Sequence, residues 1–421
     1  MSSPVPAGGR NGAPPALRIA LWGNFGTLNF GNECTLAAAV AGLRRHLPQA
    51  TLTCVCPDPA DVLARHGIAA VAMSKPDPPF SEGTSKILRL ARRLRAELMD
   101  WRRVLRVVKG TRALIVAGTG ILSDHGEGTL GFPYQLFKWC IVTRLAGGRV
   151  AFVSVGAESI SSRLGRFFLK TALRLAVYRS YRDTHSASLL SECGLRTNAD
   201  PVFPDLAFGI EVPAGRTAAP RVTIKRPCVA VGLFNYRGRG KGGASAAADY
   251  DAYLGKLCAL IGWLSANERG VRVIIGDLAY DAAVGEDLRA RLERREPGTA
   301  VAPGGLDEMP PASWEQLLAQ LAAVDYVIAS RYHNVLLAVL LGKPTISVSY
   351  EAKNEALMQQ VGLGDYCQTL DGLDLERLKA QFLEMERNAD VLRSLMAAQM
   401  RANRERLEEQ YRLVVAELSE K

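Results

Sequence analysis

The stretch LRIALWGNFGTLNFGNE, residues 17–33, shows the pattern that decides the fold: an apolar strand, a turn rich in glycine and the first residues of a helix. Apolar runs of the same kind alternate with segments of helical periodicity through both halves of the chain. Such near-continuous apolar strands are typical of a parallel sheet covered by helices on both faces. We therefore predict an α/β protein with two Rossmann-like domains, each built on a parallel sheet. The predicted strands are 17–22, 51–56, 113–118 and 149–156 in the first series and 228–234, 271–277, 326–330 and 344–350 in the second.

The domain boundaries follow from where this alternation stops. Residues 1–16 are rich in Pro, Gly and Ala and lack the basic start and apolar core of a signal peptide, so we expect a disordered lead. Prolines and small residues interrupt any long helix in 211–225, which we interpret as the linker between an N-terminal domain, 17–210, and a C-terminal domain, 226–370. Residues 371–421 have a helical pattern and are expected to form a tail of C-terminal helices.

Composition narrows the classes of function. The 421 residues are 48% hydrophobic and 22% charged, which is ordinary for a globular protein and excludes a fibre or a disordered chain. A net charge of +10 favours anionic partners: nucleic acid, anionic lipid, or phosphorylated and carboxylated small molecules. The eight cysteines fit neither a zinc site nor a disulfide framework, so we expect no metal site and reduced thiols. The apolar runs fall well short of the ~20 residues of a membrane span, and we expect a cytoplasmic location.

Residues 86–109 form a separate basic amphipathic segment. Nine basic residues stand against Glu97 and Asp100, while apolar residues from Ile87 to Val108 recur at helical spacing. The stripe is no wider than a core-facing helix requires, so we favour a surface helix that packs its apolar side on the sheet. Docking on an anionic membrane is the second interpretation and would place the protein at the inner face of the plasma membrane. Nucleic-acid binding is the third and is not expected, since no zinc-finger, RRM or helix-turn-helix pattern accompanies the charges.

Two glycine-rich turns at strand ends are candidate ligand sites in the first domain. The turn Gly23–Glu33 leads into a helix whose N-terminus offers unpaired N–H groups, although its spacing is neither a P-loop nor a dinucleotide fingerprint. The turn at 117–126 follows another strand, and ligands of open α/β sheets gather at such carboxyl ends. Asp124 or His125 could contact a sugar hydroxyl there. In both turns, capping of the following helix is the alternative explanation of the polar residues.

The strongest local signal is DYVIASRYHN, residues 325–334. Arg331 and His333 come directly after a buried strand, and residues two apart in extended backbone point to the same side, so one cleft would receive both. Lys353 follows the adjacent strand, and Arg182 follows a short strand near the end of the first series. Arg182 is suited to bind a carboxylate or phosphate bidentately, with an ion pair to a neighbouring acid as the alternative. A lone histidine is usually structural, and only the cationic cluster favours a catalytic His333.

Several sequence blocks, in this order, resemble those of the polysaccharide pyruvyl transferases. The resemblance covers roughly residues 20–365, and although each block is common, their order across two Rossmann-like halves is specific. Two positions depart from the family pattern: Asn32 stands where the family usually has Asp, and Thr119 interrupts what is often a glycine triplet. The blocks are Gly23–Glu33, Gly118–Asp124, Arg182-Asp183, Asp200–Phe203, Ser330–His333, and Tyr350 with Lys353.

The resemblance implies transfer of pyruvate from phosphoenolpyruvate onto two hydroxyls of a sugar in a cell-surface or exopolysaccharide precursor. The product would be a cyclic ketal, the by-product inorganic phosphate, and the fold like that of the GT-B glycosyltransferases. Phosphoenolpyruvate would be a co-substrate, with no further cofactor, and the acceptor could be lipid-linked, polymeric or a nucleotide sugar. The implied roles are catalysis by Arg331 and His333 and donor binding by Ser330, Arg331 and Lys353 on the C-terminal side, with Arg182 from the opposite side of the cleft. Acceptor binding is implied for Gly26, Asn29, Asn32, Glu33, Asp124 and His125 on the N-terminal side.

Two other functions stay open on the sequence alone. A glycosyltransferase of the same fold would also use a cleft and a carbohydrate acceptor. Many retaining enzymes of that kind carry two glutamates eight positions apart in the second domain, whereas the position eight after Glu351 is Gln359. A non-enzymatic protein that is recruited to a membrane or nucleic acid by 86–109 is the other alternative.

Overall fold

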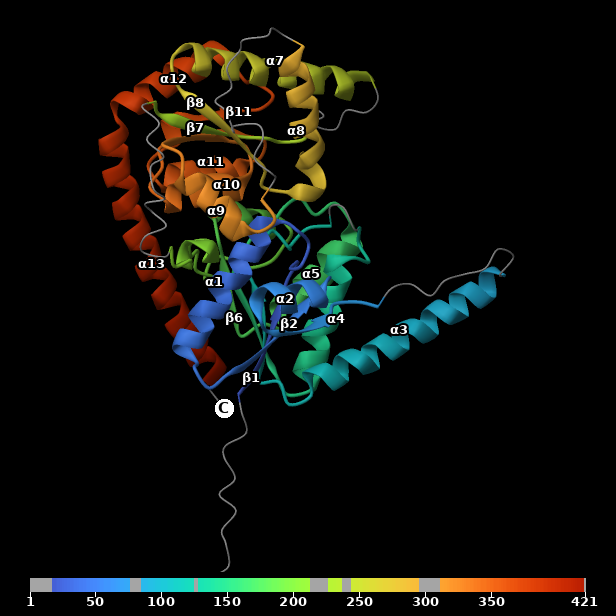
Figure 1. The fold of residues 1–421 in the computed structure, drawn as a ribbon. Helices are drawn as coiled ribbons and strands as arrows, with labels where there is room; N and C mark the ends of the chain where they lie inside the picture. The colour runs from blue at the N-terminus through green and yellow to red at the C-terminus, as the bar shows by residue number, and fades with distance from the viewer. Residues whose placement is uncertain are drawn as a thin grey trace, which may run out of the picture.

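The chain folds into two α/β domains stacked one above the other, as the computed structural model shows (Figure 1). The structure describes residues 17–75, 85–124, 128–212, 226–236, 244–294 and 311–419. The predicted lead 1–16, most of the predicted linker 211–225, and His125 lie outside the described residues. The predicted fold class, two parallel-sheet Rossmann-like domains with a helical C-terminal segment, is confirmed.

The N-terminal sheet has six strands in the order β3-β2-β1-β4-β5-β6, and all described pairings are parallel. Successive residues of β1 enter different cores: Ile19 and Leu21 pack in one cluster, Ala20 and Trp22 in the other. Burial on both faces explains why these strands read as continuous apolar runs. The strands are β1 (Arg18–Trp22), β2 (Thr51–Cys56), β3 (Ala69–Ala72), β4 (Ala113–Ala117), β5 (Arg149–Val155) and β6 (Tyr178–Tyr181), and the helices are α1 (Phe30–His46), α2 (Pro59–His66), α3 (Lys86–Val108), α4 (Phe132–Leu145), α5 (Arg163–Arg174) and α6 (Thr184–Glu192).

The C-terminal sheet has five strands in the order β11-β10-β9-β7-β8, again with parallel pairing. β9 lies in its centre, so the segment that carries Arg331 and His333 leaves from the middle of the sheet. The strands are β7 (Cys228–Gly232), β8 (Gly270–Ile274), β9 (Tyr326–Ala329), β10 (Thr345–Ser349) and β11 (Cys367–Thr369), and the helices are α7 (Ala244–Ala266), α8 (Leu278–Glu293), α9 (Trp314–Ala322), α10 (Tyr332–Leu340) and α11 (Ala352–Gln360).

Two helices follow the second sheet, α12 (Leu375–Arg387) and α13 (Ala389–Ser419). α13 runs back along the side of the molecule from the C-terminal to the N-terminal domain (Figure 1). Its buried Gln410 donates hydrogen bonds from Nε2 to Ser154 Oγ (2.9 Å) and Ser180 Oγ (2.8 Å) on β5 and β6. This helix therefore ties the two domains together on the side where it crosses them.

The segment 86–109 forms the predicted helix, but the favoured packing of its stripe on the sheet is wrong for most of its length. Among the described residues of α3, only Asp100, Val104 and Val108 are buried, all near its C-terminal end. The N-terminal part extends away from the body (Figure 1). None of the described helices combines the length and apolar character that crossing a bilayer requires.

Candidate active site

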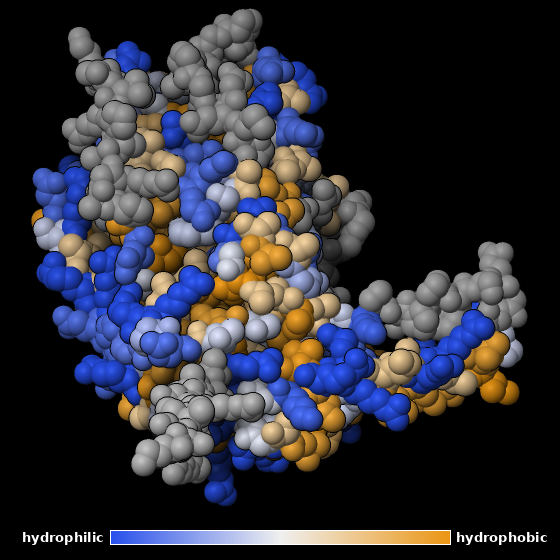
Figure 2. Space-filling view, turned by 60° about the horizontal axis from the view of Figure 1, so that its bottom comes forward, coloured by the Kyte–Doolittle hydropathy of each residue, from blue (hydrophilic) through white to orange (hydrophobic). Residues whose placement is uncertain are grey.

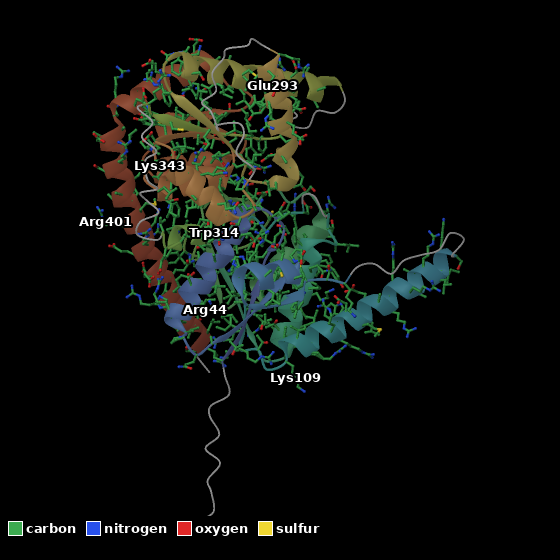
Figure 3. All side chains as sticks on the ribbon, viewed as in Figure 1. Arg44, Lys109, Glu293, Trp314, Lys343 and Arg401 are labelled. Carbon is green, nitrogen blue, oxygen red and sulfur yellow. The ribbon has the colours of Figure 1, made fainter. Side chains whose placement is uncertain are left out.

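A cavity of about 610 Å³ lies where the carboxyl ends of the two sheets face each other. This is the expected place for a ligand in open α/β sheets, and its volume lies in the range of about 300–1,000 Å³ that is common for small-molecule sites. Trp314, at the start of α9, marks the level of the domain junction in Figure 3. The lining includes Asn24, Asn29, Asn32, Thr119, Glu158 and Arg182 from the N-terminal domain and Phe234, Asp277, Arg331, His333, Tyr350 and Lys353 from the C-terminal domain.

Arg331 is held rigidly at the end of β9, as the N-cap residue of α10. Its Nε and Nη2 donate to the two carboxylate oxygens of Asp281 at 2.7 and 2.9 Å, and its guanidinium lies 4.7 Å above the Phe234 ring. Asp281 is fully buried and also accepts a hydrogen bond from the Asn235 backbone N–H (2.9 Å). Burial alone would lower the pKa of Arg331, but Asp281 and Asp277 raise it above its ordinary value. The fixed guanidinium therefore presents its remaining N–H groups to the cavity.

His333, in the first turn of α10, lies across the domain junction against the start of α1. A Cβ on Gly31 would come within 1.8 Å of His333 Nδ1, so only glycine allows the imidazole this position. Its Nε2 is buried and has no hydrogen-bond partner among the described residues. Burial lowers the pKa of His333 to about 4; Asp205 opposes this shift, while Arg182 and Lys353 add to it. The imidazole is therefore neutral at pH 7 and available to accept a proton.

Lys353 joins the two walls of the cavity. It lies in the first turn of α11, and its Nζ contacts Glu158 Oε1 of the N-terminal domain at 3.0 Å and also pairs with Glu351. The ammonium is 5.8 Å from the centre of the Tyr350 ring. Burial alone would lower the pKa of Lys353, but Tyr350 and the two carboxylates raise it, so the group stays charged.

Arg182 lies at the end of β6 and is nearly fully buried. Its guanidinium is 3.4 Å from carboxylate oxygens of both Asp183 and Asp205 and stacks over the Tyr332 ring at 5.0 Å. A Cβ on Gly156 would approach the Arg182 Cζ to 2.6 Å, so this glycine makes the close approach possible. The two long carboxylate contacts leave Arg182 less tightly paired than Arg331.

Apart from Glu158 and Arg182, the polar side chains of the N-terminal wall are the amides of Asn24, Asn29 and Asn32 and the buried hydroxyl of Thr119. Asn29 caps α1 by accepting from the Gly31 and Asn32 backbone N–H groups, and its Nδ2 donates to Asp277 Oδ2 (3.1 Å) across the cleft. Because the cap is Asn29, the helix begins at Phe30, inside the segment Gly23–Glu33 that was predicted as a turn. Thr119 has φ +58°, a left-handed backbone that favours glycine and is rare for a β-branched residue. A glycine, which the resemblance implies is common at this position, would suit that backbone.

The sequence matches the model of one protein family, "Polysaccharide pyruvyl transferase", over residues 29–352. The chain belongs to this family. The match includes Arg182, Arg331 and His333, and ends one residue before Lys353. None of the curated proteins matches the chain in sequence.

Solved structures of other proteins share the fold of this pyruvyl transferase family member. Anabaena HepE in complex with UDP and glucose has a TM-score of 0.58 at 12% identity, with 96% of this chain and 99% of that chain covered. UDP-GlcNAc 2-epimerase from Neisseria meningitidis, bound to UDP-GlcNAc, has a TM-score of 0.58 at 9% identity, with 95% of this chain and 99% of that chain covered. A putative UDP-N-acetylglucosamine 2-epimerase from Listeria monocytogenes has a TM-score of 0.58 at 12% identity, with 95% of each chain covered. At such identities the likeness establishes the GT-B-like fold alone.

Six of the site residues predicted from the sequence lie together in the lining of one cavity: Asn29, Asn32, Arg182, Arg331, His333 and Lys353. Four other predicted site residues lie outside that lining. Glu33 accepts from the Gly26 backbone N–H (2.8 Å) and lies 2.8 Å from His66 Nε2, so its carboxylate holds the glycine-rich turn. Ser330 is buried, and its carbonyl accepts from Asn354 Nδ2 (2.7 Å).

Asp124 likewise holds a loop. Its carboxylate accepts from the backbone N–H groups of Ser161 (3.0 Å) and Ser162 (2.7 Å) and from the Ser161 hydroxyl. Burial would raise the pKa of Asp124, but these hydrogen bonds lower it below its ordinary value. Roles for Gly26, Glu33, Asp124 and Ser330 in substrate binding stay predictions.

Three acidic residues of the site were missed by sequence reasoning. Glu158 follows the predicted strand 149–156, and Asp277 ends the predicted strand 271–277, so the strand-end rule could have found both. Asp281 lies one helical turn further along α8, and no sequence signal ties it to Arg331.

Proposed function

We propose that this cavity transfers pyruvate from phosphoenolpyruvate to two hydroxyls of a sugar, as a cyclic ketal. The observation that carries the proposal is the convergence of Arg182, Arg331 and Lys353 around the neutral His333 in one interdomain cavity of a pyruvyl transferase family member. Phosphoenolpyruvate presents a carboxylate and a phosphate, and guanidinium and ammonium groups in a partly buried cleft bind such anions strongly.

Two helix N-termini add to this attraction. α10 and α11 both begin at the cavity, and their N-cap residues are Arg331 and Glu351 rather than a residue that commonly caps a helix. Helix N-termini carry partial positive charge and backbone N–H groups that suit phosphate. The donor anion would therefore be received by the C-terminal wall, with Arg182 approaching from the opposite side.

Each cation is already paired with carboxylates, so donor binding must exchange partners. The Arg331–Asp281 pair is bidentate and buried, and we expect it to stay intact. The Lys353–Glu158 pair spans the cleft at a single 3.0 Å contact between side chains that are 17% and 32% exposed. We infer that the donor displaces Glu158 from Lys353, which leaves Glu158 facing the acceptor side as a carboxylate.

The chemistry balances without an added oxidant or reductant. C3 of phosphoenolpyruvate gains a proton, C2 becomes oxocarbenium-like, and one sugar hydroxyl attacks C2 and loses its proton. The second hydroxyl then attacks C2, the bond between C2 and the bridging oxygen breaks, and the proton of this hydroxyl leaves with the phosphate. The products are the ketal and inorganic phosphate.

His333 is the proton carrier of this scheme. Its low pKa arises from burial and from two nearby cations, and an incoming polyanion would offset that positive charge. Donor binding is therefore expected to raise the pKa of His333 toward neutrality, where a proton shuttle is most effective. The unpartnered Nε2 is the atom at which a proton can be exchanged.

The N-terminal wall would bind the sugar. Asn24 and Asn32 offer amide groups, which suit neutral hydroxyls rather than anions. We assign the N-terminal domain to the acceptor and the C-terminal domain to the donor. Because the donor is a cytoplasmic metabolite, we place the reaction in the cytoplasm, on a precursor of a cell-surface polysaccharide.

One competing function has a specific observation in its favour. The solved structures of the same fold contain UDP, with glucose or as UDP-GlcNAc, so a nucleotide sugar could enter this cavity as a glycosyl donor. The glutamate pair common in retaining enzymes of this fold is interrupted here, because Gln359 stands eight positions after Glu351 and lines a separate pocket.

The test is to incubate the full-length protein with phosphoenolpyruvate and a lysate of the source cell's glycans, and to measure phosphate and product mass. We expect phosphate release together with glycans that gain the mass of pyruvate less one water. The matched arm replaces phosphoenolpyruvate by UDP-glucose. Glycan modification in that arm alone would overturn the proposal in favour of glycosyl transfer.

A further inference from the structure

Helix α3 (Lys86–Val108) is an arm rather than part of the core. It projects from the N-terminal domain (Figure 1), and Ile87, Leu90, Leu94 and Leu98 are 83%, 59%, 63% and 55% exposed. Apolar residues gather along one edge of the arm and basic residues along another (Figure 2). An exposed leucine stripe of this length is unusual for a soluble protein and marks an interaction surface.

The base of the arm is fixed to the body. Lys138, fully buried in α4, donates to Asp100 Oδ2 (2.7 Å) and Glu97 Oε1 (3.0 Å), while Arg103 donates to Asp100 Oδ1 (2.6 Å). Arg103 also donates to the Ala72 carbonyl (2.6 Å). This network fixes the angle between α3 and the body. The apolar stripe therefore stays exposed and does not fold back onto the domain.

Basic residues flank the stripe along the exposed part of the arm. Arg92 and Arg95 are exposed and lie off the line of Leu90 and Leu94. Between Lys86 and Met99, five basic residues stand against one acidic residue, Glu97. An apolar stripe bordered by Lys and Arg is the pattern of helices that lie in the interface of an anionic bilayer.

The apolar surface continues beyond the arm onto the body. Trp101 donates to Tyr134 (3.0 Å), and ring contacts run from Tyr134 to Phe137 (6.3 Å) and from Phe137 to Phe167 (6.1 Å). Phe167 on α5 is 56% exposed, and the same helix carries exposed Arg163 and Arg166. Aromatic residues beside basic ones are favoured at the level of lipid headgroups.

We propose that α3, together with the outer face of α5, docks the protein on a bilayer surface rich in anionic lipid. Both properties of the surface match this partner: the leucines enter the acyl boundary while the arginines remain at the headgroup phosphates. A second copy of the arm would bring like charges together, and a nucleic acid offers nothing to the leucine stripe.

The proposal goes beyond the proposed function and does not depend on it. α5 follows the loop that carries Glu158, so the docked face and the cavity are joined by a short connection. If the proposed function also holds, docking brings the cavity to a lipid-linked acceptor.

The test is sedimentation of the full-length protein with vesicles of phosphatidylglycerol, and with vesicles of phosphatidylcholine as the neutral control. We expect binding to the anionic vesicles that weakens in high salt. Reversal of charge in Arg92→Glu/Arg95→Glu and interruption of the stripe in Leu90→Ser/Leu94→Ser should each weaken it roughly tenfold or more, since each basic residue and each buried methylene contributes.

Matched controls lie on the far side of the molecule. Arg401→Glu/Arg412→Glu makes the same charge change on exposed positions of α13, where Arg401 is labelled away from the arm in Figure 3, and Val391→Ser truncates an apolar residue that is 70% exposed. Neither should alter vesicle binding. Helix content by circular dichroism verifies the fold of each variant.

Three results would overturn the proposal. Wild type and both α3 variants sedimenting equally is one. The second is that the wild type binds no vesicles but forms a concentration-dependent dimer, and that Leu90→Ser/Leu94→Ser abolishes this dimer. The arm would then be an interface between two copies of the chain. The third is duplex DNA binding that Arg92→Glu/Arg95→Glu abolishes, again without vesicle binding. Phosphoenolpyruvate turnover in solution is measured separately, so failure here leaves the proposed function standing.

Discussion

The two walls of the interdomain cavity are built from different chemistry. The C-terminal wall presents Arg331 and Lys353 at helix N-termini, each paired with carboxylates, beside a neutral His333. The N-terminal wall presents the amides of Asn24 and Asn32, with Arg182 and Glu158 as its charged residues. One wall is suited to an anion, and the other to a neutral polyol.

Under the proposed function, this contrast would let one cleft bind an anionic donor on one wall and a neutral acceptor on the other. The cationic wall is rigid, because Arg331 is fixed by the fully buried Asp281. Among the side-chain contacts that join the walls, Lys353 to Glu158 is a single contact that a substrate could exchange, whereas Asn29 and Asp277 are held by a side-chain hydrogen bond and also by a backbone bridge. Variants on opposite walls should therefore fail in different ways.

The largest effect is expected at His333. His333→Ala should lower turnover by ~10²–10⁴, the usual size of general acid–base catalysis, with little change in helix content. Asn32→Ala on the opposite wall is the matched variant, and should retain most of the turnover at saturating acceptor. Steady-state kinetics of both variants makes the comparison, and near-native turnover of His333→Ala would remove this residue from the mechanism.

The buried pair beneath the cationic wall should control stability. Arg331→Ala leaves Asp281 buried without its guanidinium, which should lower the free energy of unfolding by about 3–5 kcal/mol. The double variant Arg331→Ala/Asp281→Asn removes the stranded charge and should recover much of that loss while remaining inactive. Urea unfolding measures both, and equal stabilities of the single and double variants would contradict the assigned pairing.

Acid should destabilise the wild type through His333. The ordinary pKa of histidine is about 6.5 when unfolded, and burial lowers that of folded His333 to about 4. Between these values the unfolded state binds more protons, so this contribution is complete above pH 6.5 and is lost as the pH falls toward 4. Relative to pH 7, the wild type at pH 4.5 should lose on the order of 2 kcal/mol more than His333→Gln. If the free energy of unfolding changed with pH in the same way in the wild type and in His333→Gln, the low pKa of His333 would be contradicted.

The Michaelis constants for donor and acceptor should show which substrate each wall of the cavity binds. Lys353→Ala should raise the constant for phosphoenolpyruvate roughly tenfold and change that for the acceptor little, because one ionic contact to the anion is lost. Glu158→Gln removes the partner of Lys353 and should lower the donor constant instead. The reverse pattern for Lys353→Ala would assign this residue to the acceptor.

The smallest effect concerns backbone strain in the N-terminal wall. Thr119 and Thr143 are both buried threonines whose hydroxyls lack partners among the described residues, but only Thr119 has a positive φ. Thr143→Gly in the helix should cost about 2 kcal/mol, whereas Thr119→Gly should lie within about 1 kcal/mol of the wild type, because strain is relieved. Thermal unfolding of the two variants makes the comparison, and equal losses would argue against strain at Thr119.

The fold was predictable because burial on both faces makes the strands apolar without interruption, as in ALIVA of β4. The short β3 and the three-residue β11 escaped prediction because edge strands of small or polar residues carry little of this signal. The packing of α3 was predicted wrongly because an apolar stripe indicates that the helix packs against a partner but does not identify that partner.

The site was predictable where the chain leaves a strand and enters a helix. Arg331 and His333 follow β9 directly, and both line the cavity. The predicted reason is wrong, because Arg331 is the N-cap of α10 and His333 lies in its first helical turn rather than in extended backbone. On the opposite wall the same kind of signal led to Glu33 and Asp124, whose carboxylates hold their own loops through backbone N–H groups. A polar residue in a turn can serve the turn or the ligand, and only the three-dimensional contacts distinguish these roles. Asp281 could not be predicted, because its pairing with Arg331 spans fifty positions in the sequence.

The most direct test of pyruvyl transfer follows the bridging oxygen of phosphoenolpyruvate. The enzyme is incubated with an acceptor glycan and donor labelled with ¹⁸O between C2 and phosphorus, and both products are analysed by mass. Ketal formation breaks the bond between C2 and this oxygen, so the account predicts that the label appears in inorganic phosphate and that the glycan gains pyruvate. Label retained in free pyruvate, with phosphate unlabelled and the glycan unchanged, would mean cleavage at phosphorus and would contradict pyruvyl transfer by this cavity.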